Sequence, residues 1–267
     1  MTLEGRDLPD QLKALLREWR QLPVDLDQVI AAGKLGPLII ERGSDRHGAI
    51  LRTGRSPRPV LFRTDGDTGR ALTARERFTV AHEIAHAVID WDPDSRPVRT
   101  RDYWRLEDLC NRFAGELLVP DRRLARLTRG TWTLSARLIE VFRLVDEANV
   151  SIQVAARRSC DVSDEVQLLG LERTFSAKHQ SATLRIAWSA GRPLIPGRVA
   201  SHLPPDHWIV SWADANEQLG YQHAEMRDLE AVMWRSTRAR AIVIVQLADR
   251  AQEVELDLPL SGADDSP

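Results

Sequence analysis

The sequence has little lysine and little cysteine, and it lacks any long apolar run. Only Lys13, Lys34 and Lys178 are lysines, so arginine carries nearly all of the positive charge. The two cysteines, Cys110 and Cys160, have neither metal-ligand spacing nor the spacing of a disulfide framework, which favours a reducing compartment. No apolar stretch approaches the length of a membrane span, and the first residues lack a basic-then-apolar signal pattern. We therefore expect a cytoplasmic protein with no membrane partner.

The overall composition excludes a general electrostatic attraction to nucleic acid or to membrane surfaces. The 267 residues are 43% hydrophobic and 28% charged, and the formal net charge is −2. A chain of this length and composition can bury the cores of two domains. Evidence for function therefore has to come from local motifs.

The first 130 residues predict a mixture of short helices and strands. Thr73 and Glu76 form a T-x-x-E capping box, which starts a long helix that ends before Pro93. Two further helices are indicated by hydrophobic residues at helical spacing, and two strands by β-rich pieces on either side of a turn. These other elements are helices at 10–22 and 24–32 and strands at 48–53 and 59–64.

The pattern after residue 100 changes from helical to extended near residue 160. Pro120 ends a helix expected at 103–119, and Asp121 is expected to cap a short basic helix. A helix, a turn and a second helix capped by Ser151 are expected within 133–158. The β-like runs that follow are 166–174, 182–189, 207–213, 241–248 and 253–260, with one helix expected near 225–235.

The stretch RERFTVAHEIAHAVID, residues 75–90, places His82, Glu83 and His86 on a helix that is largely apolar from residue 78 to residue 89. Residues i and i+4 lie one above the other on a helix, so the two imidazoles point the same way and can bind one zinc ion. Glu83 lies about 100° round the helix axis, where it can act as general base on a metal-activated water. We therefore predict a zinc site, whose ligands also suit another divalent ion such as Mn²⁺.

A catalytic zinc site needs a third protein ligand and one open position. Glu107, 21 residues after His86, is the candidate, because a second helix packed on the first can bring it across the metal. Asp108 and Glu116 are the rival carboxylates on that helix. Asn111 lies at i+4 from Glu107, where it could hydrogen-bond the far nitrogen of a histidine ligand and fix its tautomer.

Two further features leave alternatives open. Tyr103 comes one turn before the candidate third ligand, and it is either an oxyanion donor or an aromatic residue packed at the start of a helix. The helical pair within 133–158 is either a DNA-reading helix-turn-helix or a packing and substrate-docking element. Its second helix offers few polar groups for DNA, namely Gln153, Arg157 and Arg158.

The combined pattern RERFTVAHEIAHAV followed by LEDLCNRFAGELLVP resembles the ImmA/IrrE metallopeptidase family. The family signature is R-F-T-x-A-H-E-x-x-H and then E-x-x-A-N-x-F-A-x-x-L-L-x-P. The similarity covers about residues 48–158, and Cys110 replaces the alanine that is usual in the second motif. The matching residues are Arg77, Phe78, Thr79, Ala81, His82, Glu83, His86, Glu107, Asn111, Phe113, Ala114, Leu117, Leu118 and Pro120.

The resemblance implies a minimal, gluzincin-like metallopeptidase fold with His82, His86 and Glu107 on zinc. Glu83 would be the catalytic base. It also implies a zinc endopeptidase that cleaves a helix-turn-helix transcriptional repressor at one site, which switches on a stress response or mobile-element genes. The alternative is a DNA-binding or partner-binding transcriptional regulator with a structural metal site. No further Cys or His lies within residues 82–107 to close such a site, which favours catalysis.

We therefore predict an α+β protein with a minimal zincin-like metallopeptidase domain, a helical extension and a C-terminal α+β domain. No motif assigns a role to the C-terminal domain. The expected boundaries are 1–130 for the metallopeptidase domain, 131–160 for the helical pair, 161–260 for the C-terminal domain and 261–267 for a disordered tail.

Overall fold

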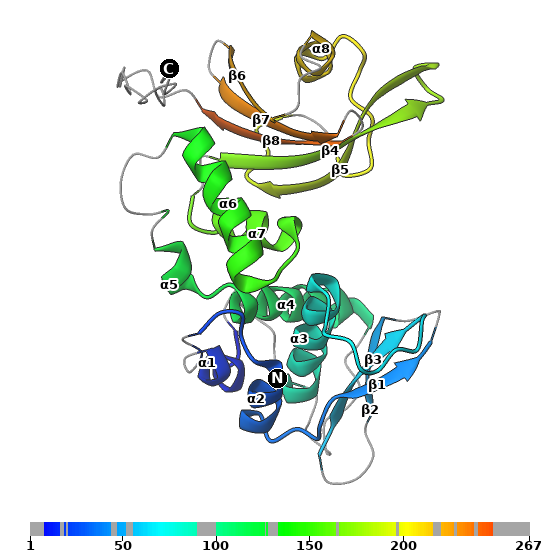
Figure 1. The fold of residues 1–267 in the computed structure, drawn as a ribbon, viewed down its shortest axis with the longest axis vertical. Coiled ribbons are helices and arrows are strands. Elements are labelled where there is room, and N and C mark those ends of the chain that lie inside the picture. The colour runs from blue at the N-terminus through cyan, green and yellow to red at the C-terminus, as the bar shows by residue number, and fades with distance from the viewer. Residues whose placement is uncertain are drawn as a thin grey trace, which may run out of the picture.

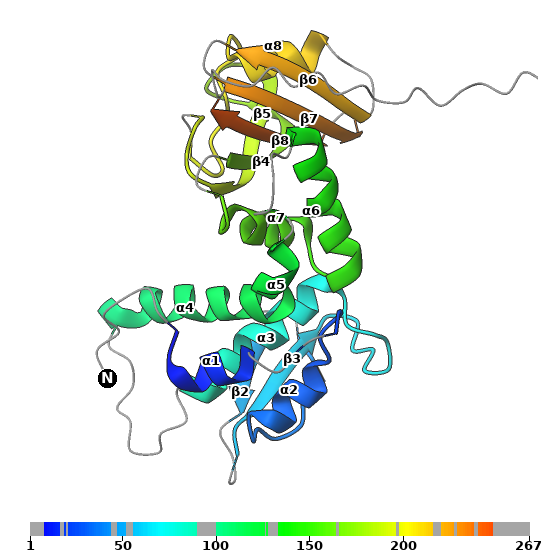
Figure 2. The same ribbon diagram turned by 90° about the vertical axis from the view of Figure 1, so that its left-hand side faces the viewer.

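The computed structural model shows two parts joined by a pair of helices (Figures 1 and 2). The lower part in Figure 1 holds a small sheet with helices beside it, and the upper part holds a larger sheet. The described residues are 8–16, 19, 21–43, 47–51, 56–89, 100–125, 127, 133–163, 166–195, 198–215, 220–226, 229–237 and 240–247.

Helix α3 is the central element of the lower part. It contacts the small sheet through β2 and β3, and it also contacts α1, α2 and α4. The predicted helix at 24–32 is confirmed, and the predicted helix at 10–22 is described as far as residue 16. The elements of this part are α1 (Asp10–Leu16), α2 (Leu26–Ala32), β1 (Ile39–Arg42), β2 (Gly48–Leu51), β3 (Arg58–Arg63), α3 (Ala74–Ile89) and α4 (Thr100–Leu118).

The small sheet has the order β1-β3-β2, so β3 is its central strand. β2 pairs with β3 in antiparallel orientation, which confirms the two neighbouring strands predicted at 48–53 and 59–64. β1 was not predicted, and it pairs with β3 in parallel orientation. β2 is therefore an edge strand of this sheet.

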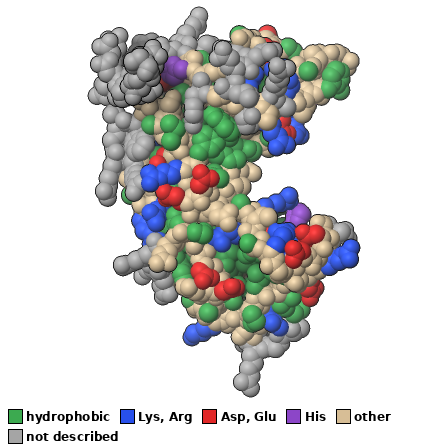
Figure 3. Space-filling model, in the orientation of Figure 1, with side chains coloured by type: hydrophobic (Ala, Val, Ile, Leu, Met, Phe, Trp, Pro, Cys, Tyr) green, Lys and Arg blue, Asp and Glu red, His purple; other side chains and the backbone are tan. Residues whose placement is uncertain are grey.

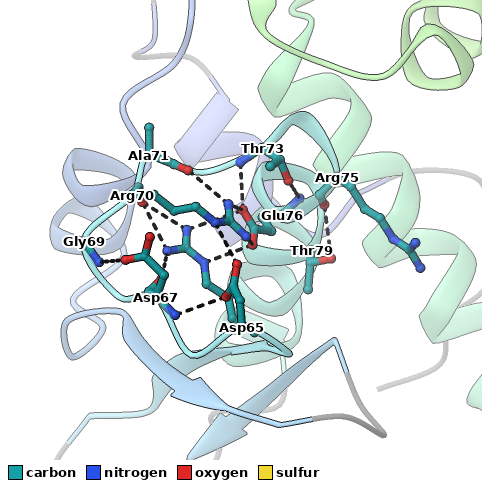
Figure 4. A network of polar contacts seen from close by, with 10 residues as sticks. Asp65, Asp67, Gly69, Arg70, Ala71, Thr73, Arg75, Glu76 and Thr79 are labelled. Carbon is teal, nitrogen blue, oxygen red and sulfur yellow. Dashed lines mark hydrogen bonds and ion pairs between the residues drawn. The ribbon is translucent and has the colours of Figure 1, made fainter.

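The N-terminus of α3 is held by a capping box and by a buried arginine. The backbone N–H of Thr73 donates to Oε2 of Glu76 at 2.8 Å, and that of Glu76 donates to Oγ1 of Thr73 at 3.3 Å (Figure 4). The predicted capping box is therefore confirmed. Arg70 and Arg63 also donate to the Glu76 carboxylate, at 2.8 and 3.0 Å. Because Arg63 is 2% exposed and belongs to β3, this network links the start of α3 to the small sheet.

We expect Glu76→Gln to lower the free energy of unfolding by about 2 kcal/mol at pH 7, because buried Arg63 would lose its charged partner. Burial alone would raise the pKa of Glu76, but hydrogen bonds from Arg70, the Thr73 backbone and Arg63 outweigh it and lower the pKa to about 2. A carboxylate with a lowered pKa stabilises the fold above its unfolded pKa, and this stabilisation is lost as the pH falls toward 2. Urea denaturation at several pH values measures both effects.

Asp65→Asn is the matched control for Glu76→Gln. Asp65 pairs with the same Arg70 at 3.3 Å, but its side chain is half exposed and solvent screens the pair, so its replacement should lower the free energy of unfolding much less than that of Glu76. Equal losses of unfolding free energy in the two variants would contradict the assignment of Glu76 as the charged partner of Arg63. The assignment would also be contradicted if the difference in unfolding free energy between wild type and Glu76→Gln stayed constant from pH 7 to pH 3.

The helices that join the two parts follow the predicted boundaries closely. α4 begins before the predicted residue 103 and still ends ahead of Pro120. Thr133 and Ser151 accept hydrogen bonds from backbone N–H groups at the starts of α6 and α7, so the predicted cap at Ser151 is confirmed. These helices are α5 (Asp121–Leu124), α6 (Leu134–Ala148) and α7 (Ile152–Cys160).

The predicted role of Asp121 is wrong. The N-cap position of α5 is Pro120, and no side chain caps this helix. The carboxylate of Asp121 instead pairs with Arg158 of α7, which also donates to Asp161 and to the backbone oxygen of Val119. A local capping pattern could not reveal this, because the partner lies 37 residues away. Arg158, 4% exposed, thus links α7 to the end of α4.

The upper part is a five-stranded antiparallel sheet of order β5-β4-β8-β7-β6. The strands predicted at 166–174, 182–189 and 241–248 are confirmed. The predicted strand at 253–260 lies outside the described residues. The elements are β4 (Val166–Ser176), β5 (Ser181–Gly191), α8 (Trp208–Ala215), β6 (Gly220–Met226), β7 (Leu229–Thr237) and β8 (Arg240–Leu247).

Two predictions for the upper part are wrong. The run 207–213 was expected to be a strand but forms α8, in which Ile209, Val210 and Ala213 are buried. This i, i+1, i+4 spacing is helical, and burial on one face outweighs the strand preference of Trp, Ile and Val. The helix expected near 225–235 is instead parts of β6 and β7. β7 lies between β6 and β8, and this pairing overrides the helix propensity of its Glu, Ala and Met.

The larger sheet is covered on both faces. Val232 and Ile242 belong to a hydrophobic core that continues through α6 and α7 into α3 and α4. Ala231 and Val243 belong to a second core together with α8. The predicted α+β fold is confirmed, whereas the domain boundaries near 130 and 160 stay predictions. No helix in the described ranges is long and apolar enough to cross a membrane.

Candidate metal centre

The two histidines of the H-E-x-x-H motif point toward one another on α3. Their Nε2 atoms lie 3.1 Å apart, and their side chains are about 15% exposed. The opposite face of α3 is buried and mostly apolar, with Val80, Ile84 and Ala87 beside the buried Arg77. Burial lowers the pKa of His82, and the neighbouring His86 lowers it further. The helix therefore presents His82 as a neutral imidazole, the form that binds metals.

Glu107 of α4 meets both histidines. Its Oε2 lies 3.3 Å from Nε2 of His82, and its Oε1 lies 3.1 Å from Nε2 of His86. Of the rival carboxylates, Asp108 is exposed on α4, and Glu116 pairs with Arg112 at 3.2 Å. The structure therefore brings together the three predicted ligands and leaves both rivals outside the group.

The arrangement of these three side chains fits a tetrahedral metal ion. Ligand atoms at about 2.0–2.1 Å from a tetrahedral zinc lie about 3.3 Å apart. The two histidine Nε2 atoms are 3.1 Å apart, and each lies 3.1 to 3.3 Å from one of the two oxygens of Glu107. Within the part of the chain that the structure describes, this is the one group of three or more His, Cys, Asp or Glu residues that could hold a metal. Three protein ligands leave the fourth position open, which is typical of a catalytic site.

Asn111 supports the first histidine. Its Oδ1 accepts a hydrogen bond from Nδ1 of His82 at 3.0 Å. With the proton on Nδ1, the lone pair of Nε2 points to the metal position. The structure thus places Asn111 where the sequence spacing had put it, one turn beyond Glu107 on α4.

Glu83 lies beside the metal position and beneath β2. Burial raises its pKa to about 7; the charge of His86 opposes this, and that of Glu107 adds to it. A Cβ atom on Gly48 would lie only 2.7 Å from Oε1 of Glu83 and 2.6 Å from Cγ2 of Thr79. The edge strand can therefore pass this close only because residue 48 is glycine. Sequence reasoning missed Gly48, although a glycine in a strand can signal such a close approach.

Tyr103 also reaches the site. The charge of Glu107 raises the pKa of the Tyr103 hydroxyl, and a hydrogen bond to the same carboxylate raises it further. Its side chain is 47% exposed. The hydroxyl therefore lies next to Glu107 and the side chain is open to solvent, rather than packed in the core.

Fold and site together give a group on two packed helices, His82, His86 and Glu107, that could hold a metal ion. Residues 70–159 match the family model Peptidase_M78, described as the IrrE N-terminal-like domain. This segment is an IrrE N-terminal-like domain, and the predicted resemblance to the ImmA/IrrE family is confirmed for it.

Similarity to solved structures extends beyond that segment. A Mycobacterium tuberculosis transcriptional regulator shares 15% sequence identity with this chain, and the TM-score is 0.50. The match covers 90% of this chain and 77% of the other, so the overall fold is similar. No curated protein matches the chain.

Proposed function

We propose that the protein is a zinc-dependent endopeptidase. The observation that carries this proposal is the convergence of His82, His86 and Glu107, with Glu83 beside them and a fourth metal position left open. Zinc would supply a Lewis acid that polarises a peptide carbonyl and lowers the pKa of a bound water toward about 7. The residues of the chain then have to hold the ion, place the peptide and move the proton.

Glu83 is the group suited to move the proton. A pKa raised to about 7 lets its carboxylate accept a proton from water and return it to the nitrogen of the leaving amine. The Tyr103 hydroxyl is a donor for the carbonyl oxygen as negative charge develops on it. Asn111 keeps His82 in the tautomer that binds metal.

The peptide substrate would add as a strand to an edge of the small sheet. β3 is paired on both sides and cannot accept a further strand, whereas β1 and β2 are the edge strands. Of these two, β2 approaches Glu83 through Gly48. A peptide on β2 would therefore pass the metal position in extended form.

The substrate that we propose is a helix-turn-helix repressor in the cytoplasm, whose cleavage switches on stress-response or mobile-element genes. This rests on the ImmA/IrrE family of residues 70–159. The structure gives no support to DNA reading by α7, because this helix packs against α4, α6 and the larger sheet. The buried Arg158 contacts protein groups.

The test is incubation of the zinc-loaded protein with the helix-turn-helix regulator encoded beside its gene. We expect one specific cut, detected by mass spectrometry of the products, which disappears with a chelator and returns with Zn²⁺ or Mn²⁺. A regulator that stays intact while the protein lowers its binding to promoter DNA would instead favour a non-catalytic partner.

A further inference from the structure

A solvent-open cleft of about 850 Å³ separates the metal-binding helices from the larger sheet. Figure 3 shows the molecule hollowed on its right-hand side between these two parts. The cleft is lined from the lower part by α3 and α4, and from the upper part by α7, β5 and residue 199. Its chemistry is set by arginines, aspartates and aromatic or apolar side chains: Arg75, Arg112, Arg157, Arg158, Asp108, Asp161, Phe78, Trp188, Val154 and Val199.

The side chains that line the cleft include four arginines and two aspartates, Asp108 and Asp161. Arg158 pairs with two aspartates, and Arg112 pairs with Glu116. Arg75 contacts a histidine nitrogen, of His47, at 2.8 Å and no carboxylate among the described residues. Arg157 is exposed and has no ion-pair partner within the described ranges. Two guanidinium groups, one on α3 and one on α7, are therefore available to an anionic occupant.

Apolar side chains also line the cleft. Phe78 and Trp188 line the cleft from opposite sides. The indole of Trp188 lies against Gly170 of β4, where a Cβ atom would come within 2.2 Å of the ring, so the position of the indole is fixed by the sheet. Val199 is 57% exposed at the same cleft. An occupant that combines acidic and apolar groups fits this surface best.

The cleft also adjoins the metal centre. Phe78 is one turn before His82 on α3, and their rings are 6.5 Å apart. Asn111, which lines the cleft, accepts the hydrogen bond from His82. A polypeptide that enters the cleft therefore comes within one helical turn of a metal ligand.

We infer that this cleft binds an acidic, partly apolar segment of the polypeptide substrate, with Arg75 and Arg157 as its charged contacts. The inference rests on the proposed endopeptidase function and gives that function a source of substrate selection outside the metal site. A polypeptide suits the cleft better than a small anion, because Arg75 and Arg157, which have no carboxylate partner among the described residues, are exposed and belong to different helices. Charge complementarity of this kind raises the rate of association and excludes basic partners.

The experiment measures peptide binding without hydrolysis. A fluorescein-labelled peptide of repeating Glu-Leu-Ala units and its Gln-Leu-Ala counterpart are titrated against the Glu83→Gln protein by fluorescence anisotropy. We expect the acidic peptide to bind at least about tenfold more tightly, and its affinity to fall with added salt. Arg157→Glu should weaken acidic-peptide binding about tenfold, and Arg157→Gln should weaken it less.

Lys178→Glu is the matched control, because Lys178 is exposed in the β4–β5 turn and does not line the cleft. It carries the same change of charge and should leave peptide affinity unchanged. Equal affinity for both peptides, or an equal loss in Lys178→Glu and Arg157→Glu, would overturn the inference. Displacement of the peptide by low millimolar inorganic phosphate would overturn it in favour of a small-anion site. Peptide binding that fails while repressor cleavage persists would overturn the inference alone and leave the proposed function standing.

Discussion

Glu83→Gln is expected to lower the rate of peptide hydrolysis by about 10²–10⁴-fold, because the amide cannot take up the proton that the carboxylate accepts. Metal content should stay near one ion per chain, since Glu83 is not among the three converging ligands. The fold should also persist, because glutamine has nearly the same shape beneath Gly48. Single-turnover cleavage of the repressor measures the rate of hydrolysis, and metal analysis of the same samples measures the metal content.

Glu116→Gln provides the comparison for Glu83→Gln. Glu116 is also a half-buried glutamate, and burial raises its pKa, but it pairs with Arg112 away from the metal centre. Its replacement should leave the hydrolysis rate within about twofold of wild type. A Glu83→Gln protein that has lost its metal, or that still cleaves at the wild-type rate, would show that base and ligand have been assigned wrongly.

Glu107→Ala is expected to weaken zinc binding by more than about 100-fold, because it removes one of three protein ligands. Loss of an outer-shell partner alone typically costs 10- to 100-fold in metal affinity. Both oxygens of Glu107 face the histidines, and among the described residues Glu107 is the one carboxylate in the group that could hold a metal. Competition with a chromogenic chelator measures the affinity.

Asp108→Ala tests whether zinc affinity depends on the position of the carboxylate on α4 or only on its charge. Asp108 is the next residue on α4 and is exposed, so its removal changes the net charge equally without touching the ligand group. We expect wild-type zinc affinity. Similar losses of zinc affinity in Glu107→Ala and Asp108→Ala would mean that Glu107 acts only through its charge and that the third ligand lies elsewhere.

The candidate site could be predicted from the sequence because its rules are local. The spacing of His82 and His86 and the capping box at Thr73 depend on helix geometry, which holds in any tertiary context. The position of Glu107 needed one added assumption, that the next helix packs on the first, and the apolar pattern of both helices supported it.

The parts that could not be predicted depend on partners distant in the sequence. Asp121 pairs with Arg158 instead of capping its own helix, and β7 is a strand because β6 and β8 lie beside it. The two adjacent arginines of α7 looked equivalent in the sequence. In the structure Arg158 is buried in ion pairs while Arg157 is exposed, so replacing both together would test stability as much as recognition.

The position of β8 has a consequence for how the protein is made. β8 is the last described strand of the chain, yet it lies between β4 and β7 at the centre of the larger sheet. While the ribosome is still synthesising the chain, β4 and β7 each carry an open edge that can pair wrongly or aggregate until residue 247 has emerged. The larger sheet, to which Trp188 of the cleft belongs, is therefore complete only after synthesis reaches this strand. The metal-binding helices are synthesised more than a hundred residues earlier, so they exist before the sheet that carries part of the proposed substrate-selecting surface is complete.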